Sequence, residues 1–208
     1  MLLGLEETKK LLAKYKIPQV KAKIVKTVKE AILFSKQNEF PVVLKIFSPK
    51  IIHKTDIWGV IIDIKNEKDL LTSWVKIEKI AKAKKTEIII QKMIFGEQII
   101  IGAKRDSVFG PVVAFGLGGI FVEILKDISF RLAPINKKEA KEMISEIQGN
   151  KILKGYRNRE LVNLLKLEEI LLSLSLMISR EQRIKEIDLN PVIANKKGAM
   201  VIDAKIIL

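Results

Sequence analysis

Three strand-like segments follow one another closely in the middle of the chain, at residues 88–94, 98–103 and 111–115. Short turns that contain glycine and aspartate separate them. Connections this short join antiparallel neighbours, because parallel strands need a crossover of about a dozen residues or more. The sequence therefore predicts an antiparallel sheet in this part of the chain.

Helical and strand patterns alternate on both sides of these segments. Apolar residues recur at helical spacing in residues 5–15, and a period-two pattern follows them. We predict further helices at residues 27–37, 67–82, 137–147 and 160–178, and strands at residues 20–25, 42–44 and 60–64 and near Val192 and Val201. This order indicates an α+β chain of two lobes, approximately residues 1–86 and 87–208, with a hinge near Gln91 to Ile94.

The composition supports a buried core. Hydrophobic residues make up 48% of the 208 residues, which is ample for a chain of this length. No apolar run approaches the roughly 20 residues of a membrane span, and charged residues enter too early for a signal peptide. The sequence therefore predicts a cytoplasmic protein. Because the chain has no cysteine, carboxylate, amide and imidazole groups remain for metal binding or covalent catalysis.

The net charge of +14 raises the question of nucleic-acid binding. The lysines alternate with apolar residues along the whole chain, and they form no basic tail or aromatic-interleaved patch. This distribution favours a solvated surface, with any focused positive field acting on nucleotides or CoA rather than on DNA or RNA. A basic nucleic-acid binder remains an alternative, and it would show steep salt dependence.

The only histidine, His53, lies beside Lys54, Thr55 and Asp56, after a predicted buried strand. Imidazole is nucleophilic near neutral pH and its bond to phosphorus is labile, so a histidine beside a lysine suits reversible phosphoryl transfer. From this segment alone, however, a surface histidine without a chemical role is the better interpretation.

Two further segments could contact phosphate. Lys45 interrupts an apolar strand, where an isolated ammonium group is unfavourable unless it meets an anion. Extension of the side chain to the strand end is the alternative. Gly118 and Gly119 belong to a glycine-rich stretch after a strand, which could bring backbone N–H groups close to phosphate oxygens. The stretch matches neither the dinucleotide nor the Walker pattern, and a tight hairpin turn explains it equally well.

Three oxygen-bearing side chains lie at neighbouring predicted strand ends near the C-terminus: Asp188, Asn190 and Asp203. Asp188 and Asn190 are two residues apart and so point to the same face of a strand. Mg²⁺ requires oxygen ligands, and water and nucleotide phosphates complete its octahedron. The sequence favours a metal site here over turn-forming residues that flank Pro191.

Several of these segments, taken in order, carry a family resemblance over nearly the whole chain. They are Pro-Val-Val-Leu-Lys45, Ser-Pro-Lys-Ile-Ile-His53-Lys-Thr-Asp, Gly96-Glu97 through Arg105-Asp106, Phe-Gly-Leu-Gly-Gly-Ile-Phe-Val-Glu123, Ser-Phe-Arg131-Leu-Ala-Pro, Leu-Lys-Gly155, and Asp188-Leu-Asn-Pro with Asp203-Ala. The series resembles the β subunit of ADP-forming acetyl-CoA synthetases. That family has an ATP-grasp fold and is related to the β subunit of succinyl-CoA synthetase.

The resemblance implies that the chain is part of an ADP-forming acid–CoA ligase. Acyl-CoA, phosphate and ADP would reversibly give acid, CoA and ATP. A separate CoA-binding α subunit would make acyl phosphate, and its own histidine would pass the phosphoryl group to His53. His53 would then phosphorylate ADP held between the two lobes of a single ATP-grasp domain, residues 1–208. An α2β2 hetero-oligomer is implied, with ATP/ADP and Mg²⁺ on this chain and CoA on its partner.

The resemblance also implies roles for particular residues. Lys45 and Arg105 would neutralise nucleotide phosphates, and Glu97 would line the nucleotide site. Asp188 would orient the phosphohistidine, and Asn190 and Asp203 would hold Mg²⁺. The adenine would meet backbone groups of the hinge, which comprises Gln91, Lys92, Met93 and Ile94. Gly118 and Gly119 would shape the loop beside the phosphohistidine.

One position departs from the family pattern. Trp58 stands before Gly59, where the family usually has a second glycine. A tryptophan cannot allow the same close approach of the backbone. This departure keeps open a non-catalytic, regulatory ATP-grasp module that binds nucleotide without transferring phosphate. The acyl group would be selected mainly by the α subunit, so this chain does not define it.

Overall fold

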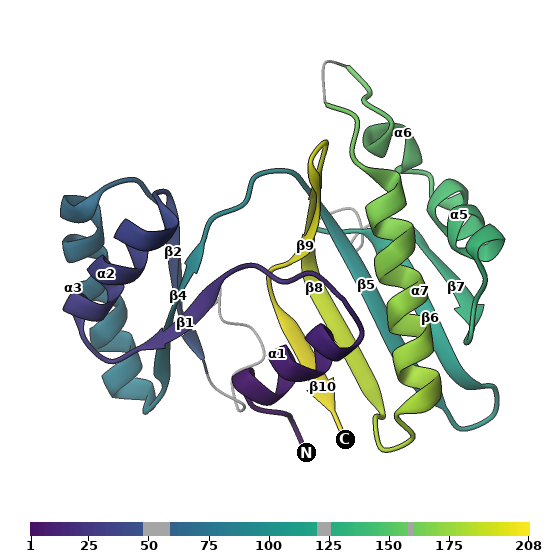
Figure 1. The fold of residues 1–208 in the computed structure, drawn as a ribbon, viewed down its shortest axis with the longest axis horizontal. Helices are drawn as coiled ribbons and strands as arrows, with labels where there is room; N and C mark the ends of the chain where they lie inside the picture. Colours follow the sequence, from purple (N-terminus) through teal and green to yellow (C-terminus); the bar gives the residue numbers. More distant parts are fainter. Residues whose placement is uncertain (48–58, 120–125, 158–159) are drawn as a thin grey trace. The chain divides into compact units, whose positions relative to one another are not determined.

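The computed structural model describes residues 1–47, 59–119, 126–157 and 160–208, and its contacts divide the chain into two units. The smaller unit comprises residues 20–94, and the larger unit comprises residues 1–19 and 95–208. Figure 1 shows the ribbon of both units. His53 and Trp58 lie outside the described residues.

The smaller unit is a four-stranded antiparallel sheet with two helices packed on one face (Figure 1). Alternation along the strands sends Val42, Leu44 and Ile46 into a core with the helices. Side-chain caps begin the helices, because Thr27 and Asn66 accept backbone N–H groups of the first turns. The elements are β1 (Ala22–Val25), α2 (Val28–Asn38), β2 (Val42–Phe47), β3 (Val60–Ile64), α3 (Glu67–Lys84) and β4 (Glu87–Lys92), with strand order β1-β4-β2-β3.

The larger unit is a six-stranded sheet with strand order β10-β8-β5-β6-β7, and β9 pairs with β8. All of its paired strands are antiparallel. The strands are β5 (Glu97–Asp106), β6 (Gly110–Leu117), β7 (Ile128–Leu132), β8 (Glu186–Asn195), β9 (Gly198–Val201) and β10 (Ala204–Ile207). The helices are α1 (Leu5–Lys14), α5 (Lys137–Glu146), α6 (Asn150–Leu153) and α7 (Leu164–Arg180).

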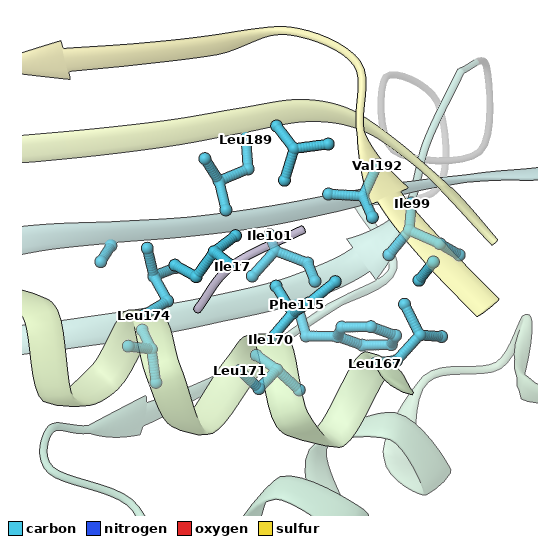
Figure 2. Close-up of a cluster of buried hydrophobic side chains, with 14 of the residues drawn as sticks. Ile17, Ile99, Ile101, Phe115, Leu167, Ile170, Leu171, Leu174, Leu189 and Val192 are labelled. Carbon is cyan, nitrogen blue, oxygen red and sulfur yellow. The ribbon is translucent and has the colours of Figure 1, made fainter. Parts of the chain in front are cut away.

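Helix α7 supplies the centre of the larger core. It presents a stripe of side chains at helical spacing, which Figure 2 shows against the sheet: Leu167, Ile170, Leu171 and Leu174. They meet alternate residues of the strands, among them Ile99, Ile101, Phe115, Leu189 and Val192. Full burial of one such side chain contributes about 1.5–3 kcal/mol, so this stripe fixes which face of the sheet is internal.

The central strands are confirmed, but they belong to two sheets rather than one. β5 and β6 form the expected antiparallel pair, whereas β4 lies between β1 and β2 in the smaller unit. The units also differ from the expected lobes at residues 87–94, which belong to the smaller unit, and at residues 1–19, which join the larger unit. A bridge between Leu2 and Ile207 shows the reason, because the N-terminus adds to the edge at β10. No helix in the described ranges is long and apolar enough to cross a membrane.

Candidate functional site

Asp188 and Asn190 lie on the face of the larger sheet opposite α7. Strand β8 sends Ile187 and Leu189 into the core, so the alternating residues between and beyond them point the other way. We call this side of strands β5, β8 and β10 the Asp188 face. Gly102 of β5 and Lys205 of β10 stand opposite Asp188 in the strand register. The structure therefore agrees with the predicted shared orientation of Asp188 and Asn190.

Asp203 reaches the same region from the connection between β9 and β10. The Asn190 N–H group donates to the Asp203 carbonyl at 3.1 Å. The Ile202 N–H group donates to the Pro191 carbonyl at 2.9 Å. These bonds hold Asn190 and Asp203 opposite each other on neighbouring segments. The structure thus brings together the three oxygen-bearing residues that the sequence singled out.

Burial raises the pKa of the Asp188 carboxyl above its ordinary value, and the negative charges of Asp203 and Glu186 raise it further. Lys205 acts in the opposite direction. Lys205 therefore does not fully compensate the Asp188 carboxylate, although it stands directly opposite Asp188 on β10. A cation bound beside it would stabilise the ionised form of Asp188.

The donors on the Asp188 face fit a magnesium ion only partly. Asn190 is exposed and Asp203 is half-buried, so both can offer oxygen atoms. One Asp203 carboxylate oxygen also accepts the Ala204 N–H group at 3.2 Å. In the described part of the chain, no group of three or more His, Cys, Asp or Glu residues could hold a metal. Two protein oxygens would leave the remaining positions to water and nucleotide phosphates, which is how Mg²⁺ is commonly bound.

Gly118 and Gly119 follow β6, and each requires glycine for a different reason. A Cβ atom on Gly118 would lie 3.1 Å from the Gln98 backbone. Gly119 has a φ of +67°, in the left-handed region. The Gly118 N–H group donates to the Gln98 carbonyl at 2.7 Å, so it extends the sheet instead of facing a phosphate. This N–H group is therefore already used within the sheet, and a phosphate contact by other groups of the glycine-rich stretch stays a prediction. Residues 120–125 lie outside the described part of the chain.

In the smaller unit, Lys45 and Gln91 share the face of the sheet that the helices do not cover. Val42 and Leu44 face the helices, so Val43 and Lys45 face away. Gln91 stands opposite Val43 in the strand register. Lys45 is 7% exposed and Gln91 is 1% exposed. Two polar side chains are thus buried on a face that carries no helix of this unit.

The predicted hinge residues next to Gln91 have partners within the smaller unit. The Lys92 amino group donates to the carbonyls of Glu39 at 3.0 Å and Phe40 at 3.3 Å. The Met93 N–H group donates to the Pro41 carbonyl at 3.1 Å. The prediction that this hinge offers its backbone to adenine must therefore omit the Met93 N–H group. Ile94 ends the smaller unit.

The Arg105 side chain donates hydrogen bonds within the larger unit. Its guanidinium group donates to the carbonyls of Ile178 at 2.6 Å and Ile184 at 3.3 Å. Strand alternation explains this, because Arg105 shares the α7 side of β5 with Ile101 and Ala103. Arg105 therefore binds the Ile178 carbonyl in the last turn of α7 and the Ile184 carbonyl in the connection from α7 to β8, and the expected contact with nucleotide phosphates is not supported. Glu97 begins β5 opposite Ala194.

Lys205 also belongs to the Asp188 face, and the sequence did not single it out as a site residue. Lys205 stands opposite Asp188 in the register of β8 and β10. Its spacing of two from Asp203 could have indicated a shared face. The chain is rich in lysine, so the sequence alone did not distinguish Lys205 from the other lysines.

The two antiparallel units and the Asp188 face define an ATP-grasp protein. The family model of the ATP-grasp domain matches residues 1–208. The chain belongs to this family, which confirms the predicted fold class and the resemblance on which it rested.

Curated relatives narrow this class. The chain is 44% identical to the beta subunit of ADP-forming acetate–CoA ligase I from Pyrococcus furiosus, over 97% of this chain and 90% of the relative. It is 39% identical to the beta subunit of ligase II from the same organism, over 97% and 89%. It is also 40% identical to 4-hydroxybutyrate–CoA ligase (ADP-forming) from Nitrosopumilus maritimus, over 97% of this chain but 30% of that protein. Thus relatives occur both as separate beta subunits and as parts of longer chains.

Solved structures agree. Acetyl-coenzyme A synthetase 1 of Ca. Korarchaeum cryptofilum, in complex with coenzyme A and Ca-AMPCP, has a TM-score of 0.93 at 39% identity, covering 100% of this chain and 93% of that one. Another structure of the synthetase contains coenzyme A and Mg-AMPPCP, with a phosphohistidine segment pointing towards the nucleotide binding site. Its TM-score is 0.86 at 38% identity, covering 100% of this chain and 92% of that one.

Proposed function

We propose that this chain is the nucleotide-binding subunit of an ADP-forming acyl-CoA ligase, and that His53 carries the phosphoryl group. The observation that carries the proposal is the phosphohistidine segment of the structurally similar Korarchaeum synthetase. This chain has one histidine, so a phosphohistidine here can form only at His53. The reaction would interconvert acyl-CoA, ADP and phosphate with acid, CoA and ATP.

The described residues support a division of roles. Lys45, buried on a helix-free sheet face, would bind nucleotide phosphates as a point charge. Asn190 and Asp203 would hold Mg²⁺, which would neutralise phosphate charge when bound. Asp188 would orient the phosphohistidine, because a carboxylate fixes an imidazole by accepting its other N–H group.

The other predicted nucleotide-site residues would have more limited roles. Glu97 would line the nucleotide site, and the segment Gln91 to Ile94 would meet the base. Within that segment, the Lys92 amino group and the Met93 N–H group already donate to backbone carbonyls of the smaller unit. Gly118 and Gly119 would shape the loop that adjoins His53.

A CoA-binding α subunit would complete the enzyme. Similar chains are named beta subunits in Pyrococcus furiosus, and the longer Nitrosopumilus ligase contains a similar segment in one polypeptide. We propose an α2β2 hetero-oligomer in the cytoplasm, where ADP and CoA are available. The positive net charge of this chain favours the anionic substrates and an acidic partner surface.

Phosphoryl labelling tests the proposal directly. The chain is co-expressed with a candidate α subunit, supplied with Mg·ATP, and examined for acid-labile, base-stable phosphate. Wild-type chain should be labelled, and His53→Ala should not be. His53→Gln is a second variant that keeps a polar side chain of similar size, and it should also remain unlabelled. Labelling of either variant would refute the role of His53.

A regulatory module that binds nucleotide without phosphoryl transfer is the second candidate, and Trp58 is the observation that favours it. It predicts that wild-type chain binds ATP but takes up no acid-labile phosphate. Trp58→Gly would then restore labelling if the tryptophan alone blocks the loop. Labelling of the wild-type chain would exclude this candidate.

A further inference from the structure

The smaller unit contains a pocket on the helix side of its sheet. The apolar part of the wall comes from Val25 of β1, Ile88 of β4, and Trp74 and Ala81 of α3. All four residues belong to the core between the helices and the sheet. The pocket therefore lies away from the helix-free face that carries Lys45, and the proposed nucleotide contacts do not use it.

The end of α3 and the edge of the sheet shape this pocket. Lys85 ends the helix with a φ of +52°, in the left-handed region. The Thr86 N–H group donates to the Ala81 carbonyl at 3.0 Å, so the chain turns directly from the helix into β4. β1 is an edge strand of this sheet. The pocket between α3 and β1 has a volume of about 340 Å³, and sites for small molecules commonly have about 300–1,000 Å³.

Positive charge predominates around the pocket. Its charged lining residues are Lys26, Glu78, Lys82, Lys85 and Glu87. Glu78 and Lys82 form an ion pair at 3.2 Å. Lys26 and Lys85 are exposed, and neither belongs to an ion pair among the residues that the structure describes. The residues outside the Glu78–Lys82 pair leave an excess of one positive charge, which a singly charged anion would balance.

Thr86 contributes a hydroxyl group without a hydrogen-bond partner. Its oxygen is buried and finds no partner in the described ranges of the chain, and such an unpaired group is unfavourable. Because no described residue holds the hydroxyl by a hydrogen bond, rotation to another staggered rotamer can turn it towards the pocket that Thr86 lines. A carboxylate in the pocket would accept a hydrogen bond from it.

We propose that this pocket binds a small monocarboxylic acid with an apolar body, such as a medium-chain fatty acid. The body would pack against Trp74 and Ala81, and the carboxylate would lie at the rim. There it would meet Thr86 and the ammonium groups of Lys26 and Lys85. The inference concerns the smaller unit alone and does not depend on phosphoryl transfer at His53.

Fluorescence titration with octanoate tests the proposal on the full 208-residue chain. Trp58→Phe leaves Trp74, which lines the pocket, as the only tryptophan. Octanoate should change the Trp74 emission saturably. Octanamide keeps the apolar body but has no charge, and it should bind roughly two- to tenfold more weakly, because exposed lysines contribute modestly. Equal affinities for the two compounds, or no saturable change with octanoate, would overturn the proposal.

Paired lysine substitutions locate the site. In the Trp58→Phe background, the double variant Lys26→Gln and Lys85→Gln should weaken octanoate binding roughly two- to tenfold and leave octanamide binding unchanged. Lys76→Gln with Lys79→Gln is the matched control, because both residues are exposed on α3 and outside the pocket lining. It removes the same charge and should change neither affinity. Equal octanoate affinities for the two double variants would refute the assigned place.

Thr86→Val tests the hydroxyl, because valine keeps the shape of threonine and removes the oxygen. The variant should bind octanoate about tenfold more weakly than the Trp58→Phe chain. Without ligand it should melt at or above the temperature of that chain, because it no longer buries an unpaired hydroxyl. A lower melting temperature with unchanged octanoate affinity would show a purely structural role and would overturn the contact between Thr86 and the carboxylate.

Discussion

Replacement of Arg105 tests whether this arginine supports the fold or binds a nucleotide. In the structure its Nη2 atom donates to the carbonyl of Ile178, in the last turn of α7, and its Nε atom donates to the carbonyl of Ile184, between α7 and β8. Arg105→Met keeps much of the apolar stem and removes both donors. We expect the variant to be less stable and to bind ADP as tightly as the wild-type chain.

The geometry sets the size of the effect. The contact between Arg105 Nη2 and Ile178 is 2.6 Å long, and a charge-assisted hydrogen bond of good geometry contributes about 1.5–3 kcal/mol. The contact to Ile184 is 3.3 Å long, so we assign it about 0.5–1 kcal/mol. The sum, about 2–4 kcal/mol, corresponds to a melting temperature lower by roughly 5–15 °C for a chain of this size.

The assay needs a probe of the larger unit. Trp74 lies in α3 and packs in the core of the smaller unit, so its fluorescence reports on that unit. Urea unfolding followed by circular dichroism gives the free energy of unfolding, and titration with Mg·ADP gives the affinity. Lys104→Met is the matched control, because Lys104 is exposed on the same strand, and it should change stability by less than about 0.5 kcal/mol.

Two results would refute this reasoning. An Arg105→Met variant as stable as the wild-type chain would show that the contacts to Ile178 and Ile184 contribute nothing. A loss of ADP affinity of tenfold or more, without a loss of stability, would show that Arg105 binds the nucleotide.

Asp188→Asn should stabilise the chain relative to wild type increasingly from acid to neutral pH. The folded-state pKa of Asp188 is raised, so the wild-type chain has its full stability from this group below the unfolded-state pKa and loses it as pH rises through the folded-state pKa. Urea unfolding at several pH values measures the gap, and a gap independent of pH would contradict this. Gly96→Ala should destabilise the larger unit by about 1–3 kcal/mol, because a new Cβ atom would lie 2.8 Å from the Ala194 carbonyl carbon; Gly198→Ala, where the nearest atom is at 3.9 Å, is the control in the same unfolding assay.

Local patterns identified most elements but not their pairing. The β5–β6 hairpin could be predicted because its two strands are joined by a short turn. Strand β4 pairs with β1 and β2, which come from earlier parts of the chain. The short connection from β4 to β5 suggested a hairpin, whereas these strands belong to separate sheets. Loop length alone therefore limits the possible neighbours without selecting among them.

The sequence by itself determined the chemistry available to this protein. It provides a single histidine, no cysteine, and carboxylate and amide groups at spacings that place Asp188 and Asn190 on one strand face. Period-two alternation makes that shared face a local property, so Asp188 and Asn190 could be grouped before any fold was known.

Only the tertiary structure decided which polar groups remain for ligands. Arg105 and Lys92 have phosphate-binding chemistry, yet backbone carbonyls distant in sequence already accept their hydrogen bonds. Gln91 was expected from the sequence only as a hinge residue, but among the described residues its buried side-chain oxygen has no hydrogen-bond donor. The physical reason is that hydrogen-bond satisfaction depends on all the strands and helices around a side chain, and those neighbours are set by long-range packing.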